Sequence, residues 1–267
     1  MFNQVLTQCW SHYQQMLCCH EQKQSCNCYN CLNEGFYNHA DEYDCEKKMT
    51  FYVLNYGKSY ISEIYHYLKN SRILDNITGQ FKVLSLGCGF CPDYYAISKY
   101  IFDLGLNIQI DYAGIDISTA WDKTRVRHKN IHYSQMDLTD LSNPLSFQGY
   151  NLIMLNKVFS TIFVHNNHIP FLQNIVNAST TSMENEAVLV FNDVNSYYMG
   201  RDVFDGTIAH HANSMRKYYT DNPPFAGNGQ WIQIPEIDVI YPFICYGNIS
   251  PLNVLAKSVF FEYRRKV

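Results

Sequence analysis

From Gly79 onward, short apolar runs alternate with segments of helical length, and no other feature restricts the fold as strongly. Strands that are apolar on both faces need cover from both sides, which helices between parallel strands provide. We therefore expect an α/β fold with a mostly parallel sheet and helices on both faces. The expected strands are Lys82–Leu86, Ile108–Ile115, Ile131–Ser134, Tyr150–Leu155 and Ala187–Asn192, and the expected helices span 93–103, 119–127 and 168–182.

The C-terminal part of the chain departs from this alternation. Trp231–Ile240 and Ser258–Arg264 have the pattern of two further strands, with no clear helix between them. Such a pair suits an antiparallel edge. The full expectation is a Rossmann-like, mostly parallel seven-stranded sheet.

A glycine turn follows the first expected strand. Lys82–Leu86 leads into Gly87 and Gly89, and a helix is expected from about Pro92. Glycines let the backbone approach a ligand closely, and the helix N-terminus offers unpaired N–H groups. No Gly-Lys-Ser/Thr follows, which excludes a P-loop. Pro92 stands where the dinucleotide fingerprint needs its third glycine, so that fingerprint is incomplete.

Two aspartates follow the next two strands. Asp116 ends the second strand, where a carboxylate can accept hydrogen bonds from ribose hydroxyls, and Asp137 follows the third, where one can meet an adenine amino group. Ligands of open parallel sheets bind beyond the carboxyl ends of the strands, so the glycine turn and both aspartates should share one crevice. The alternative is that each aspartate only caps a helix or turn.

On these residues the chain resembles the class I S-adenosylmethionine-dependent methyltransferases, over roughly 75–265. The resemblance covers the cofactor loop, the ribose-binding acid, the adenine-contacting acid, the fourth strand and the closing antiparallel strand. These correspond to Leu86-Gly87-Cys88-Gly89, Gly114-Ile115-Asp116, Met136-Asp137-Leu138, Tyr150–Leu155 and Val259–Arg264. Cys91 replaces a glycine that is common in that loop.

The resemblance implies S-adenosylmethionine as cofactor and methyl transfer as the reaction. Such transfer depends mainly on proximity and in-line orientation. No Asn-Pro-Pro-Tyr run follows the fourth strand, which disfavours the members that methylate planar amino groups. The implied cofactor-binding residues are Leu86, Gly87, Cys88, Gly89, Asp93, Asp116, Ile117, Asp137, Leu138, Asn156 and Lys157.

Polar residues after the fourth and fifth strands are the expected catalytic group. Asn156 follows the fourth strand, and Asn192 and Asp193 end the fifth, where they could orient a methyl acceptor. Tyr197 or Tyr198 could stack on a planar acceptor, and Arg201 could meet a phosphate or carboxylate. An ordinary solvated loop is the alternative for this segment.

Seven of the ten cysteines precede residue 46, which sets residues 1–74 apart from 75–267. We expect 1–74 to form a helical, cysteine-rich module and 75–267 the Rossmann-like domain. Cys28 and Cys31 form a Cys-x2-Cys knuckle typical of structural zinc, with Cys26 and Cys45 as the other expected ligands. Cys19 or His20 as the fourth ligand, an iron–sulfur cluster and metal-free thiols are the alternatives.

Composition limits location and partners. No apolar run reaches the roughly 18–20 residues of a membrane span, and the N-terminus lacks the pattern of a secretory signal. We therefore expect a cytoplasmic protein with no membrane partner. The net charge of −4 gives no global attraction for nucleic acid. RNA or a protein is the favoured acceptor over a small molecule. The alternatives are an inactive zinc-containing module that binds RNA or protein and, less favoured, an NAD-dependent oxidoreductase.

Overall fold

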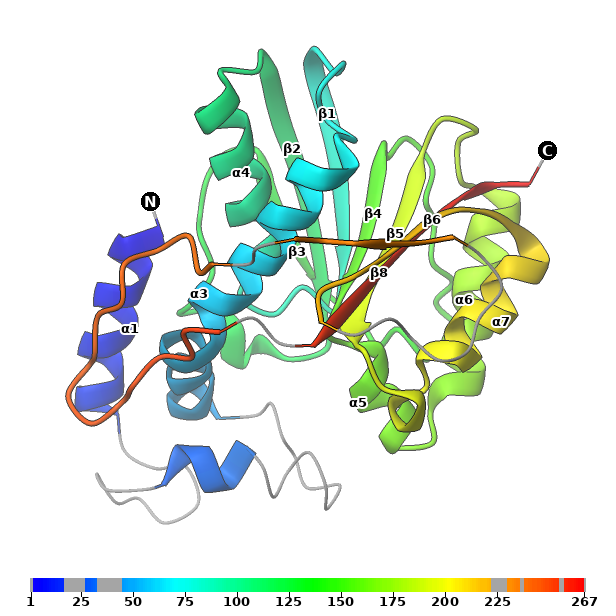
Figure 1. The fold of residues 1–267 in the computed structure, drawn as a ribbon. Coiled ribbons are helices and arrows are strands. Elements are labelled where there is room, and N and C mark those ends of the chain that lie inside the picture. The colour runs from blue at the N-terminus through cyan, green and yellow to red at the C-terminus, as the bar shows by residue number, and fades with distance from the viewer. Residues whose placement is uncertain are drawn as a thin grey trace.

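The computed structural model describes residues 2–16, 27–32, 45–221, 230–235, 238–254 and 257–266. Their centre is one sheet in the order β3-β2-β1-β4-β5-β8-β6-β7 (Figure 1). The strands are β1 (Gly79–Leu86), β2 (Ile108–Asp116), β3 (Ile131–Gln135), β4 (Leu152–Asn156), β5 (Val188–Val194), β6 (Ala212–Tyr219), β7 (Trp231–Gln233) and β8 (Ser258–Arg265). The helices are α1 (Phe2–Gln15), α3 (Glu46–Ser71), α4 (Pro92–Leu104), α5 (Phe159–Val164), α6 (His168–Thr181) and α7 (Arg201–His211), with 3-10 turns at Thr119–Trp121 and Tyr197–Met199.

The strands β1 to β5 form the parallel half of the sheet, and all five expected strands are present. β1 lies between β2 and β4, so the order in which the chain adds strands reverses beside it. A crevice opens at such a switch point, beyond the carboxyl ends of the strands. The parallel half therefore confirms a Rossmann-like arrangement and fixes where a ligand would bind.

The expectation of seven strands is wrong, because the described residues alone form a sheet of eight strands. β8 lies antiparallel between β5 and β6, and the short β7 adds to β6 in parallel orientation at the edge. The sequence did not indicate β6, because its buried positions follow no regular alternation. The expected strand Trp231–Ile240 ends at Gln233, shortly before Pro235, which has no N–H to donate to a ladder.

The expected helices over 93–103 and 168–182 are confirmed as α4 and α6, but the one over 119–127 is wrong. Only a 3-10 turn forms at Thr119–Trp121, with the Ser118 side chain accepting the Ala120 N–H. Beyond it, Arg125 reaches back to the carbonyl of Gly89, 2.9 Å from its Nε. The strand-to-strand connection therefore folds around the glycine loop instead of continuing as a helix.

The N-terminal helices share an apolar core with the sheet and α4. The Phe2 ring lies 5.0 Å from that of Tyr95, and the Tyr67 ring stacks on Phe260 of β8 at 4.5 Å. The connection between β7 and β8 crosses α3, where Lys58 Nζ donates to the Pro242 carbonyl at 2.6 Å (Figure 1). A separate module over 1–74 stays a prediction.

The zinc site also stays a prediction. Cys28 and Cys45 are buried and Cys31 is half-buried, while Cys26 lies outside the described residues, as do Cys19 and His20. Within the ranges that the structure describes, no three or more His, Cys, Asp or Glu side chains are grouped to hold a metal ion.

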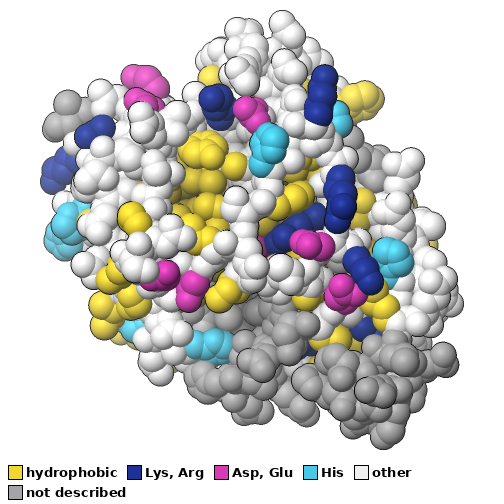
Figure 2. Space-filling model, turned by 180° about the vertical axis from the view of Figure 1, so that it is seen from behind, with side chains coloured by type: hydrophobic (Ala, Val, Ile, Leu, Met, Phe, Trp, Pro, Cys, Tyr) yellow, Lys and Arg dark blue, Asp and Glu magenta, His cyan; other side chains and the backbone are white. Residues whose placement is uncertain are grey.

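In those same ranges, no helix is long and apolar enough to cross a membrane. On the face opposite to that of Figure 1, hydrophobic side chains gather in the middle (Figure 2). Basic and acidic side chains are mixed around them. This face therefore presents no field of a single sign to a partner.

Candidate functional site

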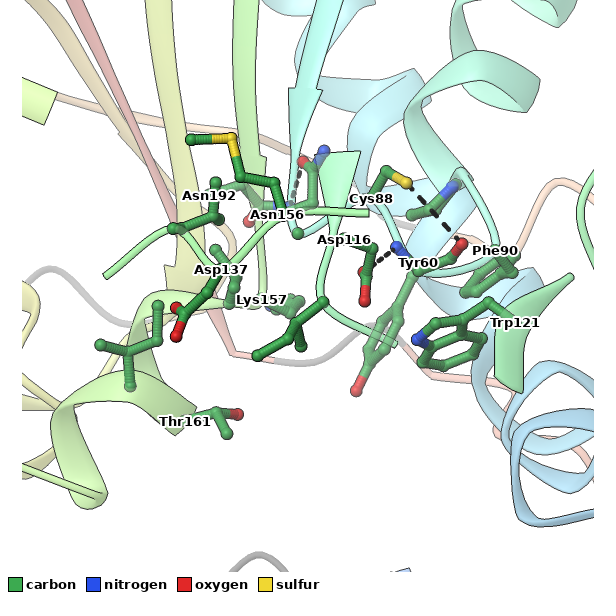
Figure 3. A pocket seen from close by; sticks show the side chains of 18 of the residues that line it. Tyr60, Cys88, Phe90, Asp116, Trp121, Asp137, Asn156, Lys157, Thr161 and Asn192 are labelled. Atoms are coloured by element: carbon green, nitrogen blue, oxygen red, sulfur yellow. Dashed lines mark hydrogen bonds between the residues drawn. The ribbon is translucent and has the colours of Figure 1, made fainter. Parts of the chain in front are cut away.

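A cavity of about 300 Å³ lies at the carboxyl ends of the parallel strands (Figure 3). Most of the residues expected to bind cofactor or acceptor line it, so the structure brings together residues from the ends of five strands. The expected residues in its wall are Gly87, Cys88, Gly89, Asp116, Ile117, Asp137, Leu138, Asn156, Lys157 and Asn192.

The glycine loop passes so close to its neighbours that side chains would not fit. Gly87 has φ +64°, and a Cβ there would lie 2.4 Å from Cγ2 of Val158. Gly89 has φ +49°, a conformation that favours glycine. Cys91, where a third glycine is common in the family, also has positive φ, at +66°. The loop thus keeps the glycine-type conformation at Cys91, where a side chain makes it strained.

The Asp116 carboxylate points into the cavity and is only 8% exposed (Figure 3). Its Oδ2 accepts the Gly89 N–H at 2.8 Å and its Oδ1 the Ser118 N–H at 2.9 Å. Burial raises the pKa of this carboxyl, and the two N–H bonds and the Arg125 charge oppose that rise. Each carboxylate oxygen can accept a second hydrogen bond, so Asp116 can hold the glycine loop and ribose hydroxyls together.

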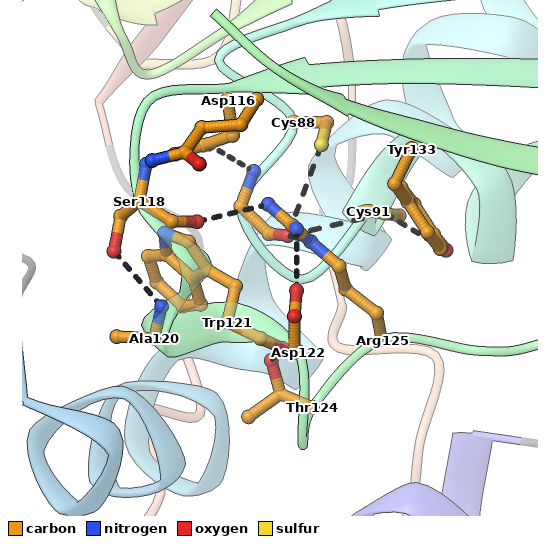
Figure 4. Close-up of polar contacts among 12 residues, drawn as sticks. Cys88, Cys91, Asp116, Ser118, Ala120, Trp121, Asp122, Thr124, Arg125 and Tyr133 are labelled. Atoms are coloured by element: carbon orange, nitrogen blue, oxygen red, sulfur yellow. Dashed lines mark hydrogen bonds and ion pairs between the residues drawn. The ribbon is translucent and has the colours of Figure 1, made fainter.

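Arg125 connects the loop after β2 to the glycine loop (Figure 4). Its Nε donates to the Gly89 carbonyl at 2.9 Å, and one terminal nitrogen pairs with Asp122 at the same distance. Its other terminal nitrogen donates to the Ser118 carbonyl at 3.4 Å. No sequence motif indicates Arg125, because its contact with the glycine loop joins residues 36 positions apart.

Asp137 faces the cavity from an exposed turn after β3 (Figure 3). Its Oδ1 accepts the Thr139 N–H at 2.8 Å and the Thr139 hydroxyl at 2.7 Å. This local turn fixes the side chain at the cavity wall. The carboxylate is therefore both a turn acceptor and available to a ligand.

Two asparagines lie side by side, Asn156 as the last residue of β4 and Asn192 near the end of β5. Asn156 and Asn192 are paired in the ladder, and Asn192 Nδ2 donates to Asn156 Oδ1 at 3.5 Å. Both are buried, at 8% and 1% exposure, and Asn156 Nδ2 and Asn192 Oδ1 have no hydrogen-bond partner within the described chain. Buried polar groups are nearly always paired, so a donor and an acceptor without partners in the cavity wall fit a bound molecule.

Lys157 follows β4 with φ +56° and belongs to a buried polar cluster. Its Nζ lies 3.0 Å from Glu63 Oε2 on α3 and also contacts the Ser258 hydroxyl at the start of β8. The Ser258 hydroxyl donates to the same carboxylate oxygen at 2.8 Å. The ammonium is thus held by α3 and β8.

Three expected site residues do not line the cavity. Leu86 is buried in the core of the sheet. Asp93 is fully buried and accepts the Tyr112 hydroxyl at 2.8 Å, which joins the start of α4 to β2, and burial raises its pKa. Asp193 accepts the Ser160 N–H at 2.9 Å at the start of α5. Both aspartates therefore hold N–H or O–H groups of the chain itself, in place of the cofactor-binding role expected for Asp93 and the catalytic role expected for Asp193.

The segment after β5 also differs from its expected role. Tyr197 and Tyr198 are exposed, at 66% and 84%, and neither lines the cavity. Arg201 pairs with Asp202 at 2.9 Å and also bonds Asn195. The Arg201 guanidinium is therefore engaged within its own segment.

An aromatic wall that no sequence motif indicates completes the cavity on the α3 side. Tyr52 and Tyr60 come from α3, and the Tyr52 ring meets Trp121 edge-on at 5.4 Å. Phe90, from the glycine loop, adjoins both Tyr52 and Trp121. The periodic tyrosines of 46–70 were the available signal, but periodicity does not reveal what a helix face contacts.

No protein-family model matches the chain, and no curated protein sequence matches it. Among solved structures, the chain is similar to a TehB-like SAM-dependent methyltransferase from Corynebacterium glutamicum, with 15% identity, 77% of this chain and 98% of that chain covered, and a TM-score of 0.42. It is also similar to a protein from Listeria monocytogenes provisionally described as a class I S-adenosylmethionine-dependent methyltransferase, with 10% identity, 100% and 81% covered, and a TM-score of 0.48. A third similar structure is the DhpI-SAM-HEP complex, with 14% identity, 90% and 99% covered, and a TM-score of 0.43.

These neighbours include class I methyltransferases, the family that the sequence resembles. Identities of 15% or less and TM-scores below 0.5 accompany each of the three. The function of this chain is therefore inferred from the residues of its own cavity.

Proposed function

We propose that the chain is an S-adenosylmethionine-dependent methyltransferase. The observation that carries this proposal is the meeting of the glycine loop and the Asp116 carboxylate at one cavity. The cavity lies at the switch point of a parallel sheet, where nucleotide-type ligands bind. The positive φ angles of Gly87 and Gly89, which favour glycine, fit such a ligand, as do the amide atoms of Asn156 and Asn192 that have no partner among the described residues.

Several of the cavity residues then have a binding role. Asp116 accepts hydrogen bonds from the ribose hydroxyls, and Asp137 accepts one from the adenine amino group. The glycine loop, from Gly87 to Gly89, lets the backbone approach the cofactor, and Ile117 and Leu138 flank the adenine. The bound cofactor supplies the methyl group on a sulfonium. The chain therefore has to bind and orient two molecules, with little proton transfer required.

The methyl acceptor is assigned to the part of the cavity at the ends of β4 and β5. Asn156 and Asn192 support this assignment, because their unpartnered donor and acceptor can hold a polar acceptor group. We propose RNA or a protein as the acceptor. Asp193 serves this region through α5, whose first turn it binds.

Transfer of a labelled methyl group tests the proposal. The purified protein is incubated with S-adenosylmethionine labelled in the methyl group and with separate RNA, protein and metabolite fractions of a cell extract. The proposal predicts label in the RNA or protein fraction with the wild type and none with Asp116→Ala. Label in the metabolite fraction alone would contradict the acceptor class. Cofactor binding with no transfer to any fraction would favour an inactive binding module.

A further inference from the structure

Glu63 is a fully buried carboxylate on α3 that none of the strand-end motifs includes. Its side chain is 0% exposed, and the Lys157 side chain that it pairs with is 9% exposed. Lys157 lines the cavity, whereas Glu63 does not line it and contacts the Lys157 ammonium. The pair therefore places one buried positive charge in the wall of the cavity and one buried negative charge directly beside it.

An unbalanced ammonium in this wall would act on any charged ligand. Coulomb interactions are stronger in a partly buried site than in water, and a charge that loses its buried partner stays uncompensated. Burial raises the pKa of the Asp193 carboxyl, and the positive charge of Lys157 opposes that rise. Its carboxylate, however, is bonded to the N–H groups of Ser160 and Val194 at 2.9 and 2.7 Å. Glu63 is thus the carboxylate in direct ion-pair contact with the ammonium.

We infer that Glu63 is a positioning residue that neutralises Lys157 and so makes the cavity accept a sulfonium cation. The inference rests on the proposed function. S-adenosylmethionine carries a positive sulfur, and its product S-adenosylhomocysteine has a neutral thioether at the same place. The charge of Lys157 therefore affects the binding of the two ligands differently, whereas a change in cavity shape alone lowers the affinity for both.

The test compares the affinities of these two ligands by calorimetry. Glu63→Gln keeps the size of the side chain and removes its charge. This variant should lower the affinity for S-adenosylmethionine about tenfold relative to the affinity for S-adenosylhomocysteine. The reason is that an uncompensated cation then faces the sulfonium. The double variant Glu63→Gln/Lys157→Met removes both charges and should restore the ratio. Lys157→Met alone leaves Glu63 charged and should shift the ratio in the opposite direction.

Glu262→Gln is the matched control. Glu262 is also buried, at 2% exposure, and pairs with Arg216 at 2.8 Å and with the Tyr67 hydroxyl at 2.9 Å, but it does not line the cavity. Its loss should lower the melting temperature without changing the ratio of the two affinities. Melting curves followed by circular dichroism identify any variant that fails to fold.

The outcomes separate this inference from the proposed function. If Glu63→Gln lowers the affinities for both ligands equally, the inference that the charge of Glu63 matters is overturned, and Glu63 is a purely structural residue. If Glu63→Gln does not fold, an unchanged ratio in Lys157→Met would overturn it instead. A wild-type protein that binds neither ligand would overturn the proposed function itself.

Discussion

The cavity has two walls of different origin. The wall of strand-end loops contains Gly87, Gly89, Asp116 and Asp137, each at or just beyond the end of a parallel strand. The opposite wall comes largely from α3, which supplies Tyr52 and Tyr60 and, behind Lys157, Glu63. The first wall follows from local sequence, because a strand fixes where its last residue lies. The second depends on how a distant helix packs, and no local pattern encodes that.

The comparison assigns the walls different roles. The strand-end wall offers carboxylates and close backbone approach, which select a nucleoside. The α3 wall offers aromatic rings and, next to Lys157, the Glu63 carboxylate that pairs with it. Substitutions in the first wall should therefore lower the affinity for the cofactor more than those in the second.

The largest effect is expected at Asp116. Asp116→Ala removes the acceptor of two backbone N–H groups as well as the proposed ribose contacts. Hydrogen bonds to charged groups contribute about 1.5–3 kcal/mol each, so affinity for S-adenosylmethionine should fall at least about 100-fold. Calorimetry measures this fall, and a variant that binds like the wild type would remove the site assignment.

A smaller but still severe effect is expected at Gly87. In Gly87→Ala the new Cβ would lie 2.4 Å from Val158 Cγ2, and the positive φ adds strain. Overpacking costs about 1–3 kcal/mol, so both stability and cofactor affinity should drop. Gly105→Ala is the matched control, because Gly105 also has positive φ but no atom within 4 Å of the new Cβ. Equal losses of stability, with cofactor binding unaffected in both variants, would contradict the close approach at Gly87.

A moderate effect is expected in the α3 wall. Tyr60→Ala should lower the affinity for S-adenosylmethionine about tenfold, since it removes one ring contact of roughly 0.5–1.5 kcal/mol and opens the wall. Tyr56, which stacks on Tyr60 at 5.8 Å but does not line the cavity, provides the control. Binding measured for both variants should differ, with Tyr56→Ala close to the wild type. Similar losses in the two would mean that α3 only supports the fold.

The smallest effect near neutral pH is expected from protonation of Asp116. Burial holds the pKa of this carboxyl above its ordinary value of 3.8. The ionised form is the proposed acceptor for ribose, so affinity should be full above the raised pKa and should fall as the pH drops through it. Titrations at decreasing pH, with circular dichroism to confirm folding, measure this fall. In Asp116→Asn it should disappear, and a pH-independent wild type would contradict the role of the charge.

The parallel strands could be predicted because burial on both faces gives them continuous apolar runs, as in Leu152–Asn156. The edge of the sheet could not, because β6 mixes exposed and buried positions irregularly. Aspartates at strand ends were found, but sequence does not say whether such a carboxylate faces a ligand or caps its own chain. Asp116 faces the cavity, whereas Asp93 and Asp193 are buried and accept N–H groups in the first turns of α4 and α5.

Long-range pairing was the other limit on the prediction. Lys157 was identified from its place after β4, but its partner Glu63 lies in a different element and carries no motif. The same holds for Arg125 and the Gly89 carbonyl. Such pairs depend on the tertiary arrangement, which a single sequence does not show.

Calorimetric titration of the wild-type protein with S-adenosylmethionine and, separately, with NADH tests the central claim most directly. Asp116 and the glycine loop around one cavity predict saturable binding of S-adenosylmethionine and none of NADH. Binding of NADH alone would contradict the account and favour an oxidoreductase. Binding of neither would also contradict it, and would leave a fold whose cavity serves another ligand.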